Sequence, residues 1–132
     1  MKYTADSWFF IELINQNTRA LNIWMEINEG KSRLIVPSIV IAEIVRKFLK
    51  NNLNRELQTL LNGFNNTEKI RIVDLTKEIA EHSGKLSYTY NMPMVDAIIL
   101  TTAILTEYNN IITDDPHFKP AEKQNRIKRV RW

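Results

Sequence analysis

Short runs of consecutive apolar residues, each followed by an amphipathic stretch, constrain the fold of this chain more than any other feature. The triplet Leu34-Ile35-Val36 is continuous rather than alternating, which is typical of a strand covered on both faces. Residues 2–6, 70–75, 111–113 and 127–132 can also form strands. Because these strands alternate with helical patterns, we expect an α/β fold with a mainly parallel sheet of four or five strands.

Helix signals lie between the predicted strands. Asp6-Ser7, Thr18, Ser38 and Thr76 are predicted to cap helices, and Pro93 stands at the start of another. A further amphipathic helix precedes a polar Asn65-Asn66 turn. Since no repeat or flexible linker divides the chain, we expect a single domain over residues 1–132.

Composition narrows the class of protein. Apolar residues make up 44% of the chain and charged residues 25%, as in ordinary globular proteins, and the absence of cysteine excludes disulfides and thiolate metal sites. We find no secretory signal pattern. The longest apolar stretch, residues 92–105, is interrupted by Asp96 and is shorter than the roughly 20 residues of a membrane span. We therefore expect a cytoplasmic protein with a buried helix at this position.

The positive charge of the chain is concentrated at its end. The net charge is +3, yet among residues 119–132 only Glu122 is acidic. Such a tail suits a polyanion such as RNA, or it protects a solvated edge strand, and the sequence leaves both interpretations open. The candidate RNA-binding residues are Lys119, Lys123, Arg126, Lys128, Arg129 and Arg131.

Four acidic residues are predicted to meet at one edge of the sheet. Asp6 ends the first strand and Asp115 follows the fourth, while Glu43 lies in the second turn of the helix after the second strand. Asp96 lies in the first turn of the helix that leads to the fourth strand. Ligands in parallel α/β sheets bind at the carboxyl ends of the strands, so this edge is the expected site.

The neighbours of these acids are unusual. Apolar residues surround nearly the whole circumference of the helix at Glu43, and Asp96 is the only charged residue between Met92 and Thr106. Two carboxylates about 4 Å apart repel by about 4 kcal/mol at an effective dielectric constant of about 20, so a convergent cluster favours a divalent cation. Oxygen ligands favour Mg²⁺ or Mn²⁺. The alternative is that each acid caps a helix or pairs with a cation, such as Arg46 or Lys47 near Glu43.

Four segments carry a resemblance to a known family. They are an N-terminal strand leading to Asp6-Ser7, Val36-Pro37-Ser38 before the helix with Glu43, Val95-Asp96-Ala97-Ile98-Ile99 continuing into Thr102-Ala103, and Ile112-Thr113-Asp114-Asp115-Pro116-His117-Phe118. The last segment is similar to a Thr-x-Asp-x-x-Phe element. With these motifs the chain resembles, nearly end to end, the PIN domains, and within them the VapC-type toxins of prokaryotic toxin–antitoxin pairs.

The resemblance implies a fold, an activity and partners. It implies a three-layer α/β/α structure that hydrolyses RNA phosphodiester bonds with Mg²⁺ or Mn²⁺, forms a homodimer and binds a cognate antitoxin. The acidic quartet carries over as Asp6, Glu43, Asp96 and Asp115, with Ser7 and Thr113 as supporting residues. Asp114 departs from the family pattern, which leaves either Asp114 or Asp115 as the fourth metal ligand, and we favour Asp115 for its spacing to Phe118.

Other interpretations remain at this point. His117 is predicted to pack or to position RNA rather than to bind metal. A catalytically inactive RNA-binding or scaffold protein with the same fold is one alternative function. A phospho-receiver module is another, although here Asp6 lacks the adjacent acid expected after the first strand of such modules.

Overall fold

The computed structural model describes residues 1–65 and 67–132 of the chain. Within this part, one sheet has the strand order β3-β2-β1-β4-β5, and every neighbouring pair is parallel. The strands are β1 (Lys2–Ala5), β2 (Arg33–Pro37), β3 (Ile70–Val73), β4 (Asn110–Ile112) and β5 (Lys128–Val130). The predicted parallel sheet is confirmed, with five strands.

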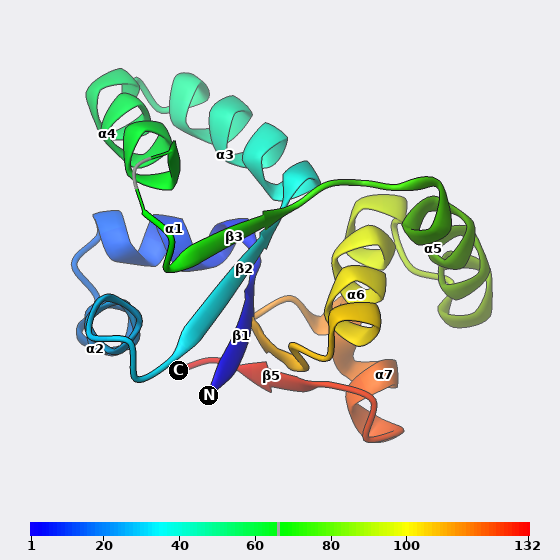
Figure 1. The fold of residues 1–132 in the computed structure, drawn as a ribbon. Coiled ribbons are helices and arrows are strands. Elements are labelled where there is room, and N and C mark those ends of the chain that lie inside the picture. Colours follow the sequence, from blue (N-terminus) through cyan, green and yellow to red (C-terminus); the bar gives the residue numbers. More distant parts are fainter. Residues whose placement is uncertain (66) are drawn as a thin grey trace.

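Helices cover both faces of this sheet. They are α1 (Ser7–Ile14), α2 (Thr18–Asn28), α3 (Ser38–Lys50), α4 (Asn54–Asn65), α5 (Lys77–Tyr90), α6 (Met94–Thr106), the 3-10 helix η1 (Pro116–Phe118) and α7 (Lys119–Lys123). Figure 1 shows α1 to α4 on one side of the sheet and α5 to α7 on the other. Parallel strands need such crossovers, and the change of direction after β3 moves the later helices to the second face. The three-layer α/β/α prediction is confirmed.

The core explains why these segments became strands and helices. Leu34, Ile35 and Val36 are at most 1% exposed, as expected for a strand covered on both faces. In α6, residues 96–103 are all buried, so this apolar segment is the predicted internal helix. Among the described residues, none of the helices has the length and apolar character needed to cross a bilayer.

Two of the predicted helix caps are wrong. Asn17, not Thr18, caps α2, because its side chain accepts hydrogen bonds from the backbone N–H groups of Arg19 and Ala20. Ser38 is the first residue of α3, and its hydroxyl accepts a hydrogen bond from the Leu75 backbone N–H at 3.1 Å. It therefore links the start of α3 to the segment after β3 instead of capping its own helix.

Other local predictions have different outcomes. Thr76 caps α5 as predicted, accepting a hydrogen bond from the Ile79 backbone N–H at 3.2 Å. Asn66, in the turn predicted after α4, lies outside the described residues.

The strand register brings the ends of β1 and β4 together. Ala5 pairs with Ile112, and the Asp6 backbone N–H donates to the Ile112 carbonyl at 3.3 Å. The residues that follow these strands, Asp6 and Thr113, are therefore neighbours at the carboxyl edge of the sheet. This edge is where the sequence predicts the functional site.

Candidate active site

Asp6 is fixed at the carboxyl edge of the sheet by hydrogen bonds to both of its carboxylate oxygens. Oδ1 accepts from the Ser7 backbone N–H at 2.7 Å, and Oδ2 accepts from the Thr113 hydroxyl at 2.6 Å. Asp6 is 7% exposed, and its burial raises the pKa of the carboxyl group although these hydrogen bonds and the charge of Lys47 oppose the rise. Thr113 is fully buried, so it holds Asp6 in one orientation.

Ser7 takes part through a second contact. Its hydroxyl accepts a hydrogen bond from the Lys47 ammonium group at 2.7 Å. Lys47 lies one turn after Glu43 in α3, so this contact places a positive charge beside both Asp6 and Glu43. The sequence placed Lys47 within reach of Glu43 but gave no sign of its contact with Ser7.

Glu43 is half-buried, and its Oε1 atom is buried without a hydrogen-bond partner. Burial raises the pKa of Glu43 to about 7, and the charge of Asp6 adds to the rise more than Lys47 reduces it. The expectation that apolar residues enclose α3 around Glu43 is wrong in part, because Ala42 and Arg46 are exposed. Glu43 itself is only partly exposed, and its pKa responds to the charges of Asp6, Asp96 and Asp115.

Asp96 is 9% exposed in the first turn of α6. Burial and then the charges of Asp115 and Asp6 raise its pKa to about 6. The charges of Asp6 and Asp115 therefore act on both Glu43 and Asp96, and Glu43 is also affected by Asp96. We call Asp6, Glu43, Asp96 and Asp115 the acid cluster.

His117 bridges two members of the acid cluster. Its Nδ1 atom lies 2.9 Å from Asp96 Oδ2 and 2.9 Å from Asp115 Oδ1. The His117 backbone N–H also donates to Asp115 Oδ1 at 2.8 Å, within the short η1 turn. Slight burial opposes protonation of the imidazole, but the charges of Asp115 and Asp96 outweigh it and raise its pKa.

His117 was predicted to pack or to position RNA, and this contact with the acids was missed. The signal available in the sequence was the position of His117, two residues after Asp115. Histidine after an Asp-Pro turn is able to return its side chain to the same carboxylate.

The acid cluster has the chemistry of a site for a divalent cation. Asp96, Asp115 and His117 each offer a ligand atom within 4.8 Å of the others. Asp6 and Glu43 add further oxygens close enough to perturb the pKa of Asp96 or to be perturbed by it. An orphaned carboxylate oxygen and several raised carboxyl pKa values indicate that Lys47 and His117 do not neutralise the cluster fully. A cation with oxygen ligands fits this donor set.

Asp114 differs from Asp115 in its surroundings. Asp114 is exposed, whereas Asp115 is partly buried and contacts His117. The Thr113 hydroxyl also accepts a hydrogen bond from the Asp115 backbone N–H at 3.1 Å, which holds the turn in place. The geometry therefore favours Asp115 over Asp114 as the fourth acid.

The basic tail is only partly available to a polyanion. Lys119, Lys123, Lys128 and Arg131 are exposed. Arg129 is not, because it is 8% exposed and its Nε donates to Glu122 Oε1 at 3.0 Å. Arg129 therefore anchors the edge strand β5 through Glu122, a role that neither interpretation of the tail gave it.

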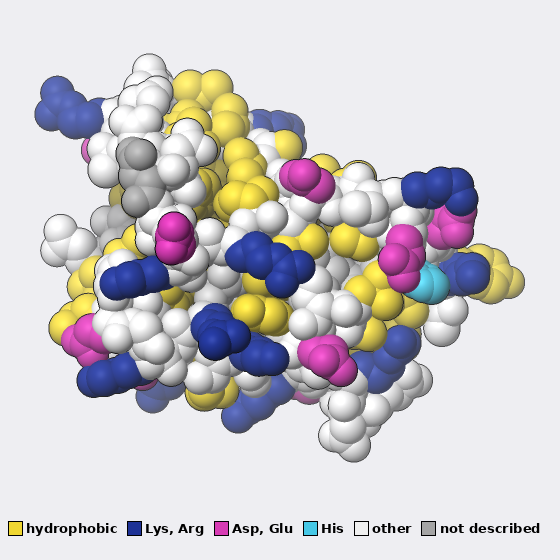
Figure 2. Space-filling model, viewed as in Figure 1, with side chains coloured by type: hydrophobic (Ala, Val, Ile, Leu, Met, Phe, Trp, Pro, Cys, Tyr) yellow, Lys and Arg dark blue, Asp and Glu magenta, His cyan; other side chains and the backbone are white. Residues whose placement is uncertain are grey.

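Basic residues outside the tail form a second positive surface that the sequence order did not reveal. Figure 2 shows several Lys and Arg side chains near the centre and along the lower part of this face, with acidic side chains scattered among them. Arg33, Lys69 and Arg71 line a hollow at the amino ends of β2 and β3. Arg33 belongs to β2, Arg71 to β3 and Lys69 to the segment just before β3, so only the fold brings them together. Glu68 also lines the hollow.

Comparison with known families and structures agrees with this architecture. The model of the PIN domain family matches residues 3–124, and the chain belongs to this family. A search among curated proteins finds no match.

Similar solved structures share the fold at low sequence identity. A chain in the structure of VapBC2 from Rickettsia felis, bound to a DNA fragment from their promoter, gives a TM-score of 0.74 at 20% identity, covering 100% of this chain and 99% of that chain. VapC20 from Mycobacterium tuberculosis, a Sarcin-Ricin loop cleaving toxin, gives 0.71 at 16% identity, covering 90% and 94%. DNA-bound VapBC from Salmonella typhimurium gives 0.71 at 17% identity, covering 100% and 98%.

Proposed function

We propose that this protein is a metal-dependent endoribonuclease that hydrolyses RNA phosphodiester bonds with Mg²⁺ or Mn²⁺. The observation that carries the proposal is the acid cluster, in which Glu43 keeps a buried oxygen without a hydrogen-bond partner. Four carboxylates that share so little positive charge are suited to an oxygen-preferring divalent cation. Membership of the PIN family supports the same activity and removes the phospho-receiver alternative.

The residues of the cluster have different proposed roles. Asp96 and Asp115 would hold the cation, with Asp6 and Glu43 completing the set of oxygens. When bound, the cation lowers the pKa of a coordinated water molecule and stabilises negative charge on phosphoryl oxygens. Thr113 and the Ser7 backbone N–H keep the Asp6 carboxylate oriented.

Two side chains can assist hydrolysis directly. Glu43 has a raised pKa of about 7 because burial and the neighbouring carboxylates oppose its charge, so a bound cation would stabilise its ionised form and free its Oε1 atom to hold the metal or its water. Lys47 reaches the edge of the cluster through its contact with Ser7 and can approach a phosphate oxygen. Neither role requires a nucleophilic side chain, in keeping with a chain that has no cysteine.

We further propose that the chain is the toxin of a VapBC-type pair, acts in the cytoplasm, forms a homodimer and is held inactive by an antitoxin protein. The likeness to VapBC structures along the whole chain supports this proposal. Exposed Lys119, Lys123, Lys128 and Arg131 are candidates for phosphate contacts with RNA.

Cleavage and metal binding test the activity together. The wild-type protein should cut RNA in the presence of Mn²⁺ and lose this activity with a chelator. Isothermal titration should detect Mn²⁺ binding that Asp96→Asn weakens strongly. Asp74→Asn is the matched control, since Asp74 is an exposed acid directly after β3, outside the acid cluster. If RNA binds but is never cut, and Asp96→Asn changes neither Mn²⁺ binding nor melting, the inactive scaffold alternative is correct.

The toxin assignment needs a separate experiment. Expression of the wild-type chain in a bacterial host should arrest growth, and Asp6→Ala should abolish the arrest. Co-expression of a small protein encoded beside the gene should restore growth. Harmless expression of a protein that cleaves RNA in vitro would contradict the toxin assignment and leave the ribonuclease proposal intact.

A further inference from the structure

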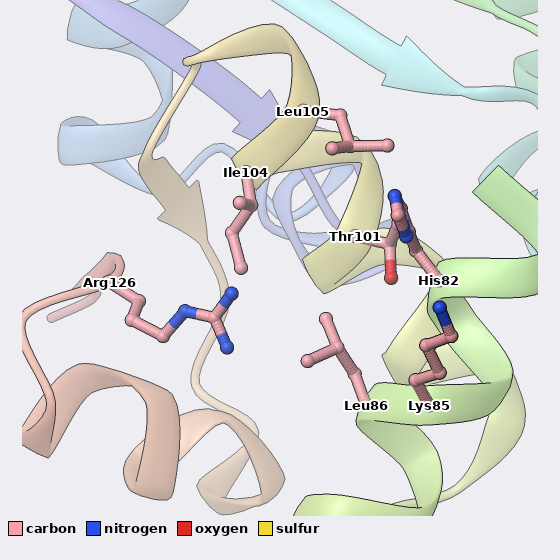
Figure 3. A pocket seen from close by; sticks show the side chains of 7 residues that line it. All are labelled: His82, Lys85, Leu86, Thr101, Ile104, Leu105 and Arg126. Carbon is pink, nitrogen blue, oxygen red and sulfur yellow. The ribbon is translucent and has the colours of Figure 1, made fainter. Parts of the chain in front are cut away.

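A pocket lies between α5, α6 and the turn that follows α7, away from the acid cluster. Its volume is about 190 Å³. Leu86 of α5 and Ile104 and Leu105 of α6 supply apolar walls. Figure 3 shows Leu86 and Ile104 on different sides of the space, with the Arg126 guanidinium group extending toward it. The pocket can therefore receive an apolar group.

All charged side chains at this pocket are basic. Lys85 and Arg126 line it together with His82, and its lining includes no acid. Among the described residues, none of the three forms an ion pair, and the Arg126 side chain donates only to the Tyr90 hydroxyl, at 3.1 Å. Charges of one sign beside apolar walls focus the electric field and attract the opposite charge. We call this site the cationic pocket.

A buried hydroxyl group gives a second, independent indication of a ligand. Thr101 lines the cationic pocket and is 1% exposed, and its Oγ1 atom has no hydrogen-bond partner. Figure 3 shows this oxygen directed toward the space between the surrounding side chains. Nearly all buried polar groups in proteins are hydrogen-bonded, so an exception at the wall of a pocket indicates a missing partner.

We propose that the cationic pocket binds a small organic anion, with its apolar part between Leu86 and Ile104 and its carboxylate or phosphate group facing Lys85 and Arg126. The volume is below the roughly 300–1,000 Å³ of pockets for drug-sized ligands, so the ligand is small. An oxygen of the ligand supplies the partner that the Thr101 hydroxyl lacks. Arg126, which the sequence also offers as a candidate for RNA contacts, lines this pocket.

The cationic pocket is separate from the acid cluster, although both use α6. Ile104 lies about 12 Å along the helix axis from Asp96. Binding of the anion can therefore be tested without relying on the proposed nuclease activity.

The test uses four simple probes on the full chain with chelator present. Phenyl phosphate and benzoate carry both an apolar ring and an anionic group, whereas benzyl alcohol lacks the charge and inorganic phosphate lacks the ring. We expect phenyl phosphate or benzoate to shift the backbone amide NMR signals of Leu86, Ile104 and Arg126, with a Kd in about the millimolar range or tighter. The two incomplete probes should bind at least about tenfold more weakly. The stronger of the two complete probes identifies the preferred head group.

Variants locate the binding energy. Lys85→Gln and Arg126→Gln should each weaken binding by about tenfold, as the loss of a charged hydrogen bond predicts. Thr101→Val should weaken binding without unfolding the protein. Lys50→Gln, an exposed lysine at the end of α3, should leave it unchanged. The proposal is wrong if neither complete probe shifts signals at the pocket, or if both bind equally well to the wild type, Lys85→Gln and Arg126→Gln.

Discussion

The acid cluster and the cationic pocket lie at different places along α6, and they differ in the sign of the charge that the protein leaves uncompensated. The acid cluster joins four carboxylates with Lys47 and His117 and keeps raised carboxyl pKa values. The cationic pocket has three basic side chains and no acid in its lining. The first region is therefore suited to a cation and the second to an anion.

The two regions share a second property. Among the described residues, the buried side-chain polar atoms without a hydrogen-bond partner are Glu43 Oε1 and Thr101 Oγ1. One lies in the acid cluster and the other at the cationic pocket. The other buried side-chain polar atoms in the described part of the chain have partners, as Thr102 does by donating to the Ile98 carbonyl at 2.7 Å. In the described residues, each unpaired buried side-chain atom therefore lies at a site with a proposed ligand.

The largest expected effect is on RNA cleavage, and it distinguishes the two adjacent acids Asp114 and Asp115. Asp115→Asn should lower RNA cleavage more than about a hundredfold, because it removes a charged oxygen that faces Asp96 and His117. Asp114→Asn should change it less than about threefold, since Asp114 is exposed. Initial cleavage rates at saturating Mn²⁺ provide the measurement. Equal losses in both variants would show that the acid cluster extends to Asp114.

A smaller loss is expected from the residue that orients Asp6. Thr113→Val removes the donor 2.6 Å from Asp6 Oδ2 and leaves the volume of the side chain almost unchanged. A hydrogen bond to a charged group contributes about 1.5–3 kcal/mol, so cleavage should fall by about tenfold or more. Thr113→Ser keeps a hydroxyl group and should retain most of the activity. If Thr113→Ser is as impaired as Thr113→Val, packing rather than the hydrogen bond holds Asp6.

Stability should depend on pH because of the acid cluster. Glu43 has a folded pKa of about 7, above its ordinary value of 4.5, so the stability it adds as a neutral group is present below pH 4.5 and lost as pH rises through 7. The raised pKa values of Asp96, Asp6 and His117 act in the same direction. After allowance for its partial exposure, Glu43 should contribute about 1 kcal/mol.

Thermal melting with chelator should therefore give a lower Tm at pH 8 than at pH 5.5, and saturating Mn²⁺ should reverse much of the loss at pH 8. Glu43→Gln should flatten this pH dependence, while Glu107→Gln, at an exposed position after α6, should not. A Tm that rises from pH 5.5 to pH 8 without metal would contradict the electrostatic description of the cluster.

The sequence predicted most of the fold and the place of the acids for physical reasons. An apolar triplet bounded by turn residues is typical of a buried strand, and parallel strands end at the same edge, so Asp6 and Asp115 were expected to converge. Glu43 and Asp96 stood out because their helices offered few polar neighbours. Each of these inferences depends only on the pattern of apolar and polar residues within a single strand or helix.

The features that the sequence did not predict depend on side-chain directions across elements. The His117 side chain contacts Asp96, which lies 21 residues earlier in the chain. Lys47 of α3 donates to the hydroxyl of Ser7 in α1. The cationic pocket combines α5, α6 and the turn after α7, and Arg129 turns inward to Glu122 although its neighbours in the tail face solvent. The sequence pattern does not tell which of Lys128 and Arg129 is buried. Only the packing of β5 as an edge strand decides it.

The smallest expected effect compares the two adjacent threonines of α6 and tests the second unsatisfied atom directly. Thr101 and Thr102 are each 1% exposed, but only the Thr102 hydroxyl has a partner. Thr101→Val should therefore raise the free energy of unfolding by about 1 kcal/mol, because a desolvated and unpaired hydroxyl is replaced by a methyl group of similar size. Thr102→Val should be neutral or destabilising by about 1 kcal/mol, since it removes a hydrogen bond. Urea unfolding measures both. A Thr101→Val variant that is more stable yet binds the probe anion less tightly would identify the hydroxyl as a group kept for a ligand, whereas a loss of stability in both variants would mean that Thr101 already has a partner in the folded protein.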